Sequence, residues 1–288
     1  MRIALIYYFG HAGTTGAYME KVMKTAGVPY DLYGVENPSA IPGGYDLYLR
    51  IDHGDYKFDI PAHLRPAVFY AIDTHLPKPY KRIRRQARHY DIVFCAQKQG
   101  AARLHGDTGV DTQWLPLACD PDVHKKLDIA KQYDIGFVGR NADKFARGRH
   151  LPALRNRYPA SFIGQAEFHK MSSIYSASRI GFNSAIINDI NMRVFEVMSC
   201  GCFCLTNAIQ DNGFSELFTP GRDLVTYSND RELFALISHY LSHEREREEI
   251  ARAGHALVTG KHTYVHRVQT MFNYIAYKFG GAFNSLRI

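Results

Sequence analysis

The residues best suited to hold an anionic or hydroxyl-bearing ligand lie within residues 188–207, where Arg193 and Glu196 stand three positions apart. The apolar residues around them recur at helical spacing, so the two side chains share one region of a predicted helix. Gly201 is expected to end this helix, and the apolar run at 202–206 predicts a buried parallel strand. Packing explains the apolar residues. It does not explain a guanidinium and a carboxylate at a strand end, where open α/β folds bind ligands.

This stretch resembles the C-terminal signature of GT-B glycosyltransferases, in the glycosyl transferases group 1 form found in CgeB-like proteins. The matching residues are Asn191, Arg193, Phe195, Glu196, Gly201, Glu216, Pro220, Gly221, Asp223, Lys261, Tyr264 and Arg267. The resemblance covers about residues 133–275. It implies an α/β fold of the GT-B class, in which two Rossmann-like domains face a cleft and a C-terminal helix crosses back to the first domain.

A chain of 288 residues is long enough for two domains. With the resemblance, this predicts an acceptor-side Rossmann-like domain at 1–122 and a nucleotide-sugar-binding Rossmann-like domain at 123–265. Residues 266–288 are expected to form the helix that packs back on the N-terminal domain.

Alternating strand and helix patterns support this organisation. Strands are predicted at 2–9, 29–35, 45–51, 66–72, 91–96, 112–118, 133–140, 160–164, 179–185, 202–206 and 224–227. Helices are predicted up to residue 24 and near 78–89, 98–104, 169–178, 230–241, 244–254 and 261–279.

On the donor side, the resemblance places the pyrophosphate of a nucleotide sugar against the turn Gly139–Arg140. Glycine lets the backbone come close and arginine offers paired donors to phosphate, although a plain surface turn is the alternative. Arg140 and Arg193 are the candidates to hold the departing diphosphate, and Glu196 the candidate to accept hydrogen bonds from ribose hydroxyls. The complete donor-side set is Gly139, Arg140, Asn188, Asn191, Arg193, Glu196, Asp211, Asn212 and Gly213.

On the acceptor side, Gly10, His11 and Gly13 lie in a glycine-rich loop after the first predicted strand. This loop is neither a dinucleotide fingerprint nor a phosphate-binding P-loop, so it is either a tight turn or a loop at the acceptor. Asp73 and His75 follow another strand, and with Arg193 they form the catalytic candidates. The alternative for Asp73 is that its side chain caps the following helix.

The resemblance implies a retaining transfer without a metal ion or other cofactor. The commoner family-4 pattern has two glutamates eight positions apart; Glu196 matches the second, whereas Asn188 occupies the first. An inverting enzyme would need a general base, for which Asp73, His75 or His11 would serve. Residues 119–122 superficially look like an acidic metal motif but are interpreted as a turn between domains.

The formal net charge is +7 and the sequence pI is about 9.1. Charge alone permits nucleic acid, anionic lipid or phosphorylated partners. The most basic segment, 78–89, is expected to be a solvated helix; the alternative is a surface for a charged acceptor or for peripheral contact with an anionic membrane. No segment has the apolar length of a membrane span, so a cytoplasmic protein is expected. The five cysteines are expected to be buried thiols.

Three functions fit these observations. The first is a glycosyltransferase that moves a sugar from a nucleotide sugar, with uridine diphosphate as the expected carrier, to an acceptor that is a saccharide, protein, lipid or small molecule. The second is a GT-B nucleotide-sugar epimerase. The third is a non-catalytic basic module that binds nucleic acid or anionic surfaces.

Overall fold

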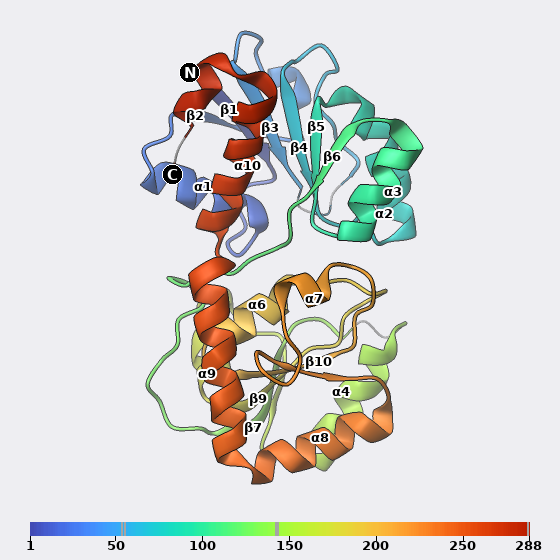
Figure 1. Cartoon of the computed structure of the whole chain (residues 1–288), viewed down its shortest axis with the longest axis vertical. Coiled ribbons are helices and arrows are strands. Elements are labelled where there is room, and N and C mark those ends of the chain that lie inside the picture. The colour runs from blue at the N-terminus through green and yellow to red at the C-terminus, as the bar shows by residue number, and fades with distance from the viewer. Residues whose placement is uncertain (53, 55, 142–143, 287) are drawn as a thin grey trace. The chain divides into compact units, whose positions relative to one another are not determined.

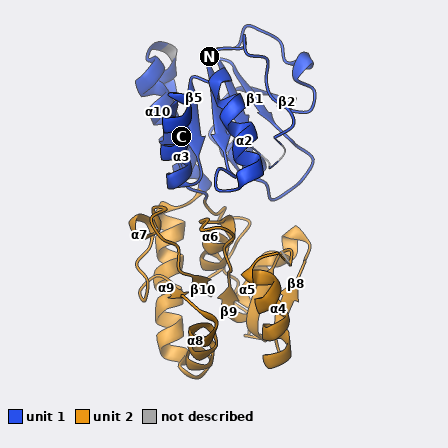
Figure 2. Cartoon of the chain, turned by 90° about the vertical axis from the view of Figure 1, so that its right-hand side faces the viewer, with its two compact units in different colours: residues 1–117, 264–288 blue, residues 118–263 orange. Residues whose placement is uncertain are grey.

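The computed structural model describes residues 1–52, 54, 56–141, 144–286 and 288. By their internal contacts, the residues form two compact units (Figure 2). Unit 1 comprises residues 1–117 and 264–288, and unit 2 comprises residues 118–263. The chain therefore leaves unit 1 after Leu117 and returns to it at Tyr264, whereas the sequence placed these boundaries at 122 and 265.

Unit 1 contains a parallel sheet of six strands (Figure 1). The strands are β1 (Ile3–Tyr7), β2 (Tyr30–Gly34), β3 (Leu47–Ile51), β4 (Ala67–Ala71), β5 (Ile92–Cys95) and β6 (Asp111–Trp114). Their order is β2-β1-β3-β4-β5-β6, so the winding direction reverses between β1 and β3. The carboxyl ends of those two strands are where a doubly wound sheet binds ligands.

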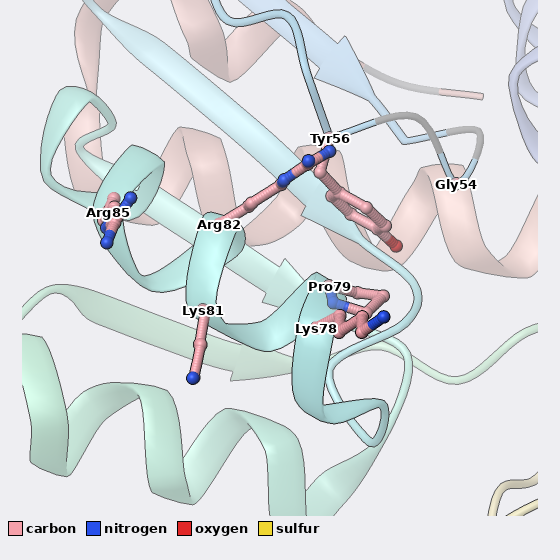
Figure 3. Close-up of a pocket in the computed structure, with 7 residues that line it drawn as sticks. All are labelled: Gly54, Tyr56, Lys78, Pro79, Lys81, Arg82 and Arg85. Carbon is pink, nitrogen blue, oxygen red and sulfur yellow. The ribbon is translucent and has the colours of Figure 1, made fainter.

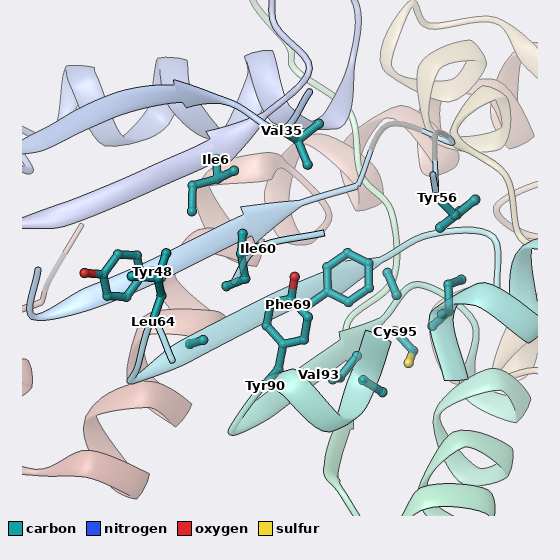
Figure 4. Close-up of a cluster of buried hydrophobic side chains, with 14 of the residues drawn as sticks. Ile6, Val35, Tyr48, Tyr56, Ile60, Leu64, Phe69, Tyr90, Val93 and Cys95 are labelled. Carbon is teal, nitrogen blue, oxygen red and sulfur yellow. The ribbon is translucent and has the colours of Figure 1, made fainter. Parts of the chain in front are cut away.

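Side chains of both faces of this sheet are buried, as expected for central parallel strands. One face forms the core cluster drawn in Figure 4, in which Ile6, Phe69 and Val93 from three strands pack with Tyr90 and Ile60. The helices of the unit before residue 118 are α1 (Thr15–Thr25), α2 (Pro77–Gln86) and α3 (Lys98–Thr108), and short 3₁₀ turns lie at Pro38–Ala40 and Ala87–His89.

The last helix, α10 (Tyr264–Phe279), belongs to unit 1 and packs on α1. The rings of Tyr18 and Tyr264 are stacked with centroids 4.9 Å apart. The Arg267 Nε atom donates a hydrogen bond of 2.7 Å to the carbonyl oxygen of Pro116. The return of the C-terminal helix to the first sheet is thereby confirmed. A 3₁₀ turn at Gly281–Ser285 follows.

Unit 2 contains a second parallel sheet, of five strands. They are β7 (Tyr133–Val138), β8 (Phe162–Gly164), β9 (Ser178–Phe182), β10 (Phe203–Asn207) and β11 (Val225–Tyr227). The order is β11-β10-β9-β7-β8, so the winding direction reverses between β7 and β9. The α/β class with two Rossmann-like sheets is confirmed.

The helices of unit 2 are α4 (Ala146–Arg157), α5 (Met171–Ser176), α6 (Met192–Ser199), α7 (Phe214–Leu217), α8 (Asp230–Ser242) and α9 (Glu244–Lys261). Helix α7 lies where the sequence predicts no helix, because a four-residue helix is too short to show periodicity. Helix α9 continues seven residues beyond the predicted end at Gly254, a glycine that faces Met198 and the Asp223 carbonyl so closely that a Cβ would not fit.

All five cysteines are free and buried, which confirms that they are apolar packing residues. Burial raises the pKa of the Cys202 thiol to about 12, so this thiol is protonated at neutral pH. None of the helices within the described ranges is both long and apolar enough to cross a bilayer.

Candidate functional site

Arg193, in the first turn of α6, lies at the reversal point of the unit 2 sheet. Its Nε atom donates a hydrogen bond of 3.0 Å to the carbonyl oxygen of Val138, the last residue of β7. Its Nη1 atom donates one of 3.1 Å to Oδ1 of Asn183, which directly follows β9. The guanidinium therefore joins the carboxyl ends of the two strands between which the winding direction changes.

Two neighbours fix this guanidinium further. It lies over the ring of Phe137, with 4.5 Å between Cζ and the ring centroid. A Cβ built on Gly139 would collide with Nη2 of Arg193, so only glycine allows this approach after β7. The sequence assigned Gly139 to close contact with pyrophosphate; in the structure the residue that approaches it closely is Arg193.

A second arginine, which is buried, makes this region electropositive. Arg147, in α4, donates two hydrogen bonds to the carbonyl oxygen of Ser184. Burial and the nearby Arg193 lower the pKa of Arg147 to about 10. The Asp189 carboxyl interacts with both arginines. Burial raises its pKa to about 6, so a small further rise would protonate it near neutral pH. A site with two arginines and one such carboxyl favours an anionic ligand.

Glu196, also in α6, is buried, with one oxygen directed to an imidazole that the sequence did not single out. Oε1 of Glu196 lies 3.4 Å from Nε2 of His124, and His124 is fully buried. Within the described residues, no hydrogen bond uses the other carboxylate oxygen. The sequence pattern predicts a turn at residues 119–122 and assigns no role to His124. The only signal that pointed to His124 was its position close to that acidic turn.

Asn191 precedes α6 and carries an amide whose two polar atoms are buried. Neither Nδ2 nor Oδ1 has a hydrogen-bond partner among the residues that the structure describes. A buried polar group without a partner is costly, and such a group at a strand-end site is what a polar ligand would satisfy. Arg140, in contrast, is exposed, and it forms no ion pair within the described part of the chain.

We expect Asn191→Ala to separate stability from ligand binding. Removing a buried amide without partners is expected to leave the free energy of unfolding unchanged or to raise it by up to about 1 kcal/mol. The affinity for the ligand of this site should fall by roughly tenfold, because its hydrogen bonds to the amide are lost. Urea unfolding and titration calorimetry on the same preparations measure both. A variant that is destabilised by more than 1 kcal/mol would show that the amide has a structural partner.

The remaining donor-side candidates join two loops. Asn188 has a left-handed backbone, with φ of 60°, and its amide exchanges hydrogen bonds with the backbone of Gln210. The Nδ2 atom of Asn212 donates to the carbonyl oxygen of Asn188 at 2.8 Å. Asp211 is exposed with φ of 52°, and Gly213, with φ of 82°, precedes α7. Asn188 and Asn212 are therefore committed to the backbone and position these loops.

In unit 1, Asp73 and His75 follow β4 near the tyrosine of the preceding loop. The backbone N–H of Asp73 donates to Oη of Tyr56 at 3.0 Å. The alternative that Asp73 caps the next helix is wrong, because Leu76 is the N-cap of α2 and no side chain caps it. Burial lowers the pKa of His75 although Asp73 opposes this shift, so His75 is neutral at pH 7.

The loop after β1 carries the other acceptor-side candidates. Gly10 and Gly13 have φ of 102° and 78°, backbone conformations that favour glycine. The ring of His11 stacks on Tyr8, with centroids 5.5 Å apart. The loop ends at Thr14, whose hydroxyl accepts a hydrogen bond from Ala17 N and so caps α1. These residues lie at the reversal point of the unit 1 sheet.

Comparison with protein families identifies the class of this arrangement. The family described as glycosyl transferase-like matches residues 124–273, just over half of the chain. This chain belongs to the glycosyl transferase-like family. The match includes both arginines, Glu196 and the whole reversal point of the unit 2 sheet. The expected enzyme class, a glycosyltransferase, is thereby confirmed. A direct sequence comparison with curated proteins found no match.

Solved structures share the fold of this glycosyltransferase at low identity. HepE of Anabaena, in complex with UDP and glucose, is 13% identical with a TM-score of 0.66, over 96% of this chain and 100% of that one. Sucrose-phosphate synthase of Thermosynechococcus elongatus is 12% identical with a TM-score of 0.68, over 97% and 99%. A DNA-modifying β-glucosyltransferase is 15% identical with a TM-score of 0.59, over 96% and 98%. These matches confirm the GT-B fold.

Proposed function

We propose that this glycosyltransferase moves a hexose from a UDP-sugar to an acceptor, with retention at the anomeric carbon and without a metal ion. The observation that carries the proposal is the position of Arg193, fixed between the ends of β7 and β9 and one helical turn before Glu196. A similar fold in HepE holds UDP-glucose, which supports this choice of donor. An acidic residue at this position suits the ribose hydroxyls, and the arginines suit the diphosphate.

The reaction itself requires charge stabilisation more than bond chemistry from the protein. The bond between the anomeric carbon and the β-phosphate oxygen breaks, and UDP departs with the electron pair. The acceptor oxygen bonds to the same carbon, and its proton leaves to a base or to the departing diphosphate. Arg193, Arg147 and Arg140 would stabilise the charge that develops on the diphosphate, the task that a divalent ion performs in metal-dependent transferases.

The acceptor side of the proposal rests on unit 1. Asp73, His75 and His11 remain the candidates for a general base if the transfer inverts the anomeric carbon, and His75 is neutral and so able to accept a proton. The acceptor itself is a saccharide, protein, lipid or small molecule. The exposed cations of 78–89 support a peripheral contact with an anionic membrane.

A thermal-shift series tests the donor. Wild-type protein is heated with UDP, ADP, GDP, UDP-glucose and UDP-N-acetylglucosamine, each with EDTA and with excess Mg²⁺. UDP at about 100 times its Kd should stabilise by roughly 2.7 kcal/mol, and the shift should be the same with EDTA. A shift that appears only with Mg²⁺ would contradict the metal-free mechanism. No shift with any nucleotide would contradict the donor site.

Turnover separates the remaining functions. A transferase releases UDP fastest when an acceptor is supplied, whereas an epimerase converts the donor with no acceptor present. A non-catalytic basic module would bind anionic polymers in a strongly salt-dependent way and would not respond to nucleotide sugars.

Binding of UDP should be coupled to proton uptake by Asp189. Its pKa is raised to about 6 by burial, and a diphosphate nearby raises it further, so the bound state holds the proton at a higher pH than the free state. Affinity should therefore increase as the pH falls from 8 to 6.5. Calorimetry in two buffers with different ionisation enthalpies counts the protons, and Asp189→Asn should take up fewer. Equal uptake by both proteins would exclude Asp189 as the source.

A further inference from the structure

Unit 1 contains a pocket to whose described lining four cationic side chains contribute. Its volume is about 410 Å³, in the range of small-molecule sites. Besides Pro79, the lining consists of Gly54, Tyr56, Lys78, Lys81, Arg82 and Arg85. Figure 3 shows the Arg82 side chain extending toward Tyr56 and the Lys78 side chain beside the hydroxyl end of its ring. In this view, Lys78 and Arg82 are the two cations on the Tyr56 side of the pocket.

The four cations occupy one face of α2. They stand at helical spacing over residues 78–85, whereas the buried residues Tyr80, Ile83 and Gln86 form the opposite face. Like charges three and four positions apart repel each other. Arg84, outside the pocket, pairs with Asp107, but within the described residues no carboxylate pairs with any of the four. The stripe is unfavourable by itself and becomes favourable when an anion lies in the pocket.

The pocket also adjoins a catalytic candidate. Tyr56, which lines it, accepts the hydrogen bond from the backbone of Asp73. Gly54 lines it too, and a Cβ placed there would be 3.6 Å from Oδ2 of Asp73. Asp73 is not among the described lining residues, but it adjoins two of them, so a ligand that extends past Tyr56 and Gly54 would meet its carboxylate. Repulsion by that carboxylate directs the anionic part of the ligand toward α2, and a hydroxyl is the group that suits Asp73.

We propose that the acceptor of this glycosyltransferase carries a phosphate group, which Lys78 and Arg82 bind in this pocket while an acceptor hydroxyl faces Asp73. The inference rests on the proposed function, since it names the acceptor class for the same transfer. Guanidinium groups bind phosphate through paired hydrogen bonds, and ammonium groups add point charge. The phosphate belongs either to a soluble phosphorylated compound or to a lipid headgroup.

The test uses inorganic pyrophosphate as the probe and the full-length protein saturated with UDP, so that the donor site is occupied. The binding variant is Lys78→Gln/Arg82→Gln. The matched control, Arg84→Gln/Arg88→Gln, removes the same charge from the same segment outside the pocket. The Kd values of the wild type and the control for pyrophosphate should agree within about twofold. The Kd of the binding variant should be at least about tenfold higher than that of the wild type. Circular dichroism confirms that all three are folded.

Equal pyrophosphate affinity in the two variants, or no binding to the wild type, would overturn the inference. A UDP titration of the same proteins distinguishes this result from a failure of the donor proposal. If the binding variant binds UDP as tightly as the wild type does, its donor site is intact. If the wild type does not bind UDP, the proposed function on which the inference rests is wrong.

Vesicle flotation then identifies the source of the phosphate. A lipid headgroup is indicated if the wild type and the control float with phosphatidylglycerol vesicles but not with phosphatidylcholine vesicles, and the binding variant floats with neither. Pyrophosphate binding without flotation of any protein indicates a soluble phosphorylated acceptor. If all three proteins float alike, the pocket has no role in membrane binding. The pyrophosphate result then supports a soluble phosphorylated acceptor.

Discussion

Replacing Arg193 by alanine is expected to lower kcat/KM for the UDP-sugar by roughly a hundredfold or more, the usual effect of removing a preorganised group that stabilises developing charge. The same change should destabilise the fold. Oδ1 of Asn183, on a fully buried side chain, loses its donor, and a buried acceptor without a partner costs about 1–3 kcal/mol. Steady-state kinetics with denaturant unfolding on the same preparation measures both losses.

Arg193→Lys separates charge from geometry. Lysine keeps the positive charge but cannot bond to both Val138 and Asn183 with a planar fork, so kcat should recover only in part. Arg179→Ala is the matched control, because this arginine of the same unit pairs with Asp134 near the surface. If Arg193→Ala retained wild-type kinetics, the assignment of this arginine to the diphosphate would be wrong.

Glu196→Gln is expected to remove recognition of the ribose while it keeps the shape of the side chain. Hydrogen bonds to a charged group contribute about 1.5–3 kcal/mol, so the affinity for UDP should fall by roughly ten- to a hundredfold. The decisive comparison is UDP against 2′-deoxy-UDP. The wild type should bind UDP much more tightly, and the variant should bind both alike.

A control for this experiment is His124→Asn, which removes the imidazole nitrogen 3.4 Å from Glu196 and leaves a smaller polar side chain. This variant should preserve the preference for UDP over the deoxy compound, although it lowers the affinity if His124 positions the carboxylate. A Glu196→Gln protein that still prefers UDP would show that the ribose is bound elsewhere.

Much of the fold was accessible from the sequence because its signals are local. Buried parallel strands such as Ile3–Tyr7 and Phe203–Asn207 are short apolar runs, and α6 carries a clear apolar periodicity followed by Gly201. The motif around Arg193 and Glu196 identified the class of protein because those residues are close together in the chain.

The partners of these residues were not accessible in the same way. Arg193 is bound by Val138 and Asn183, 55 and 10 residues away, and Glu196 faces His124. Such contacts depend on which strands lie at the reversal point of the sheet, a property of strand order that no local pattern contains. The cationic face of α2 was seen as a basic segment, but the pocket beside it requires Gly54 and Tyr56 from a separate loop.

The division of unit 1 into two stretches of chain has a consequence for biosynthesis. The ribosome completes residues 118–263, and with them every strand of the second sheet, before it makes α10. The first sheet is already synthesised by then, but the face of α1 that holds Thr15 and Tyr18 still lacks the helix whose Tyr264 contacts both residues. Of the two units, unit 1 is therefore started first and completed last, and the α1 face around Tyr18 stays uncovered on the nascent chain until α10 is made.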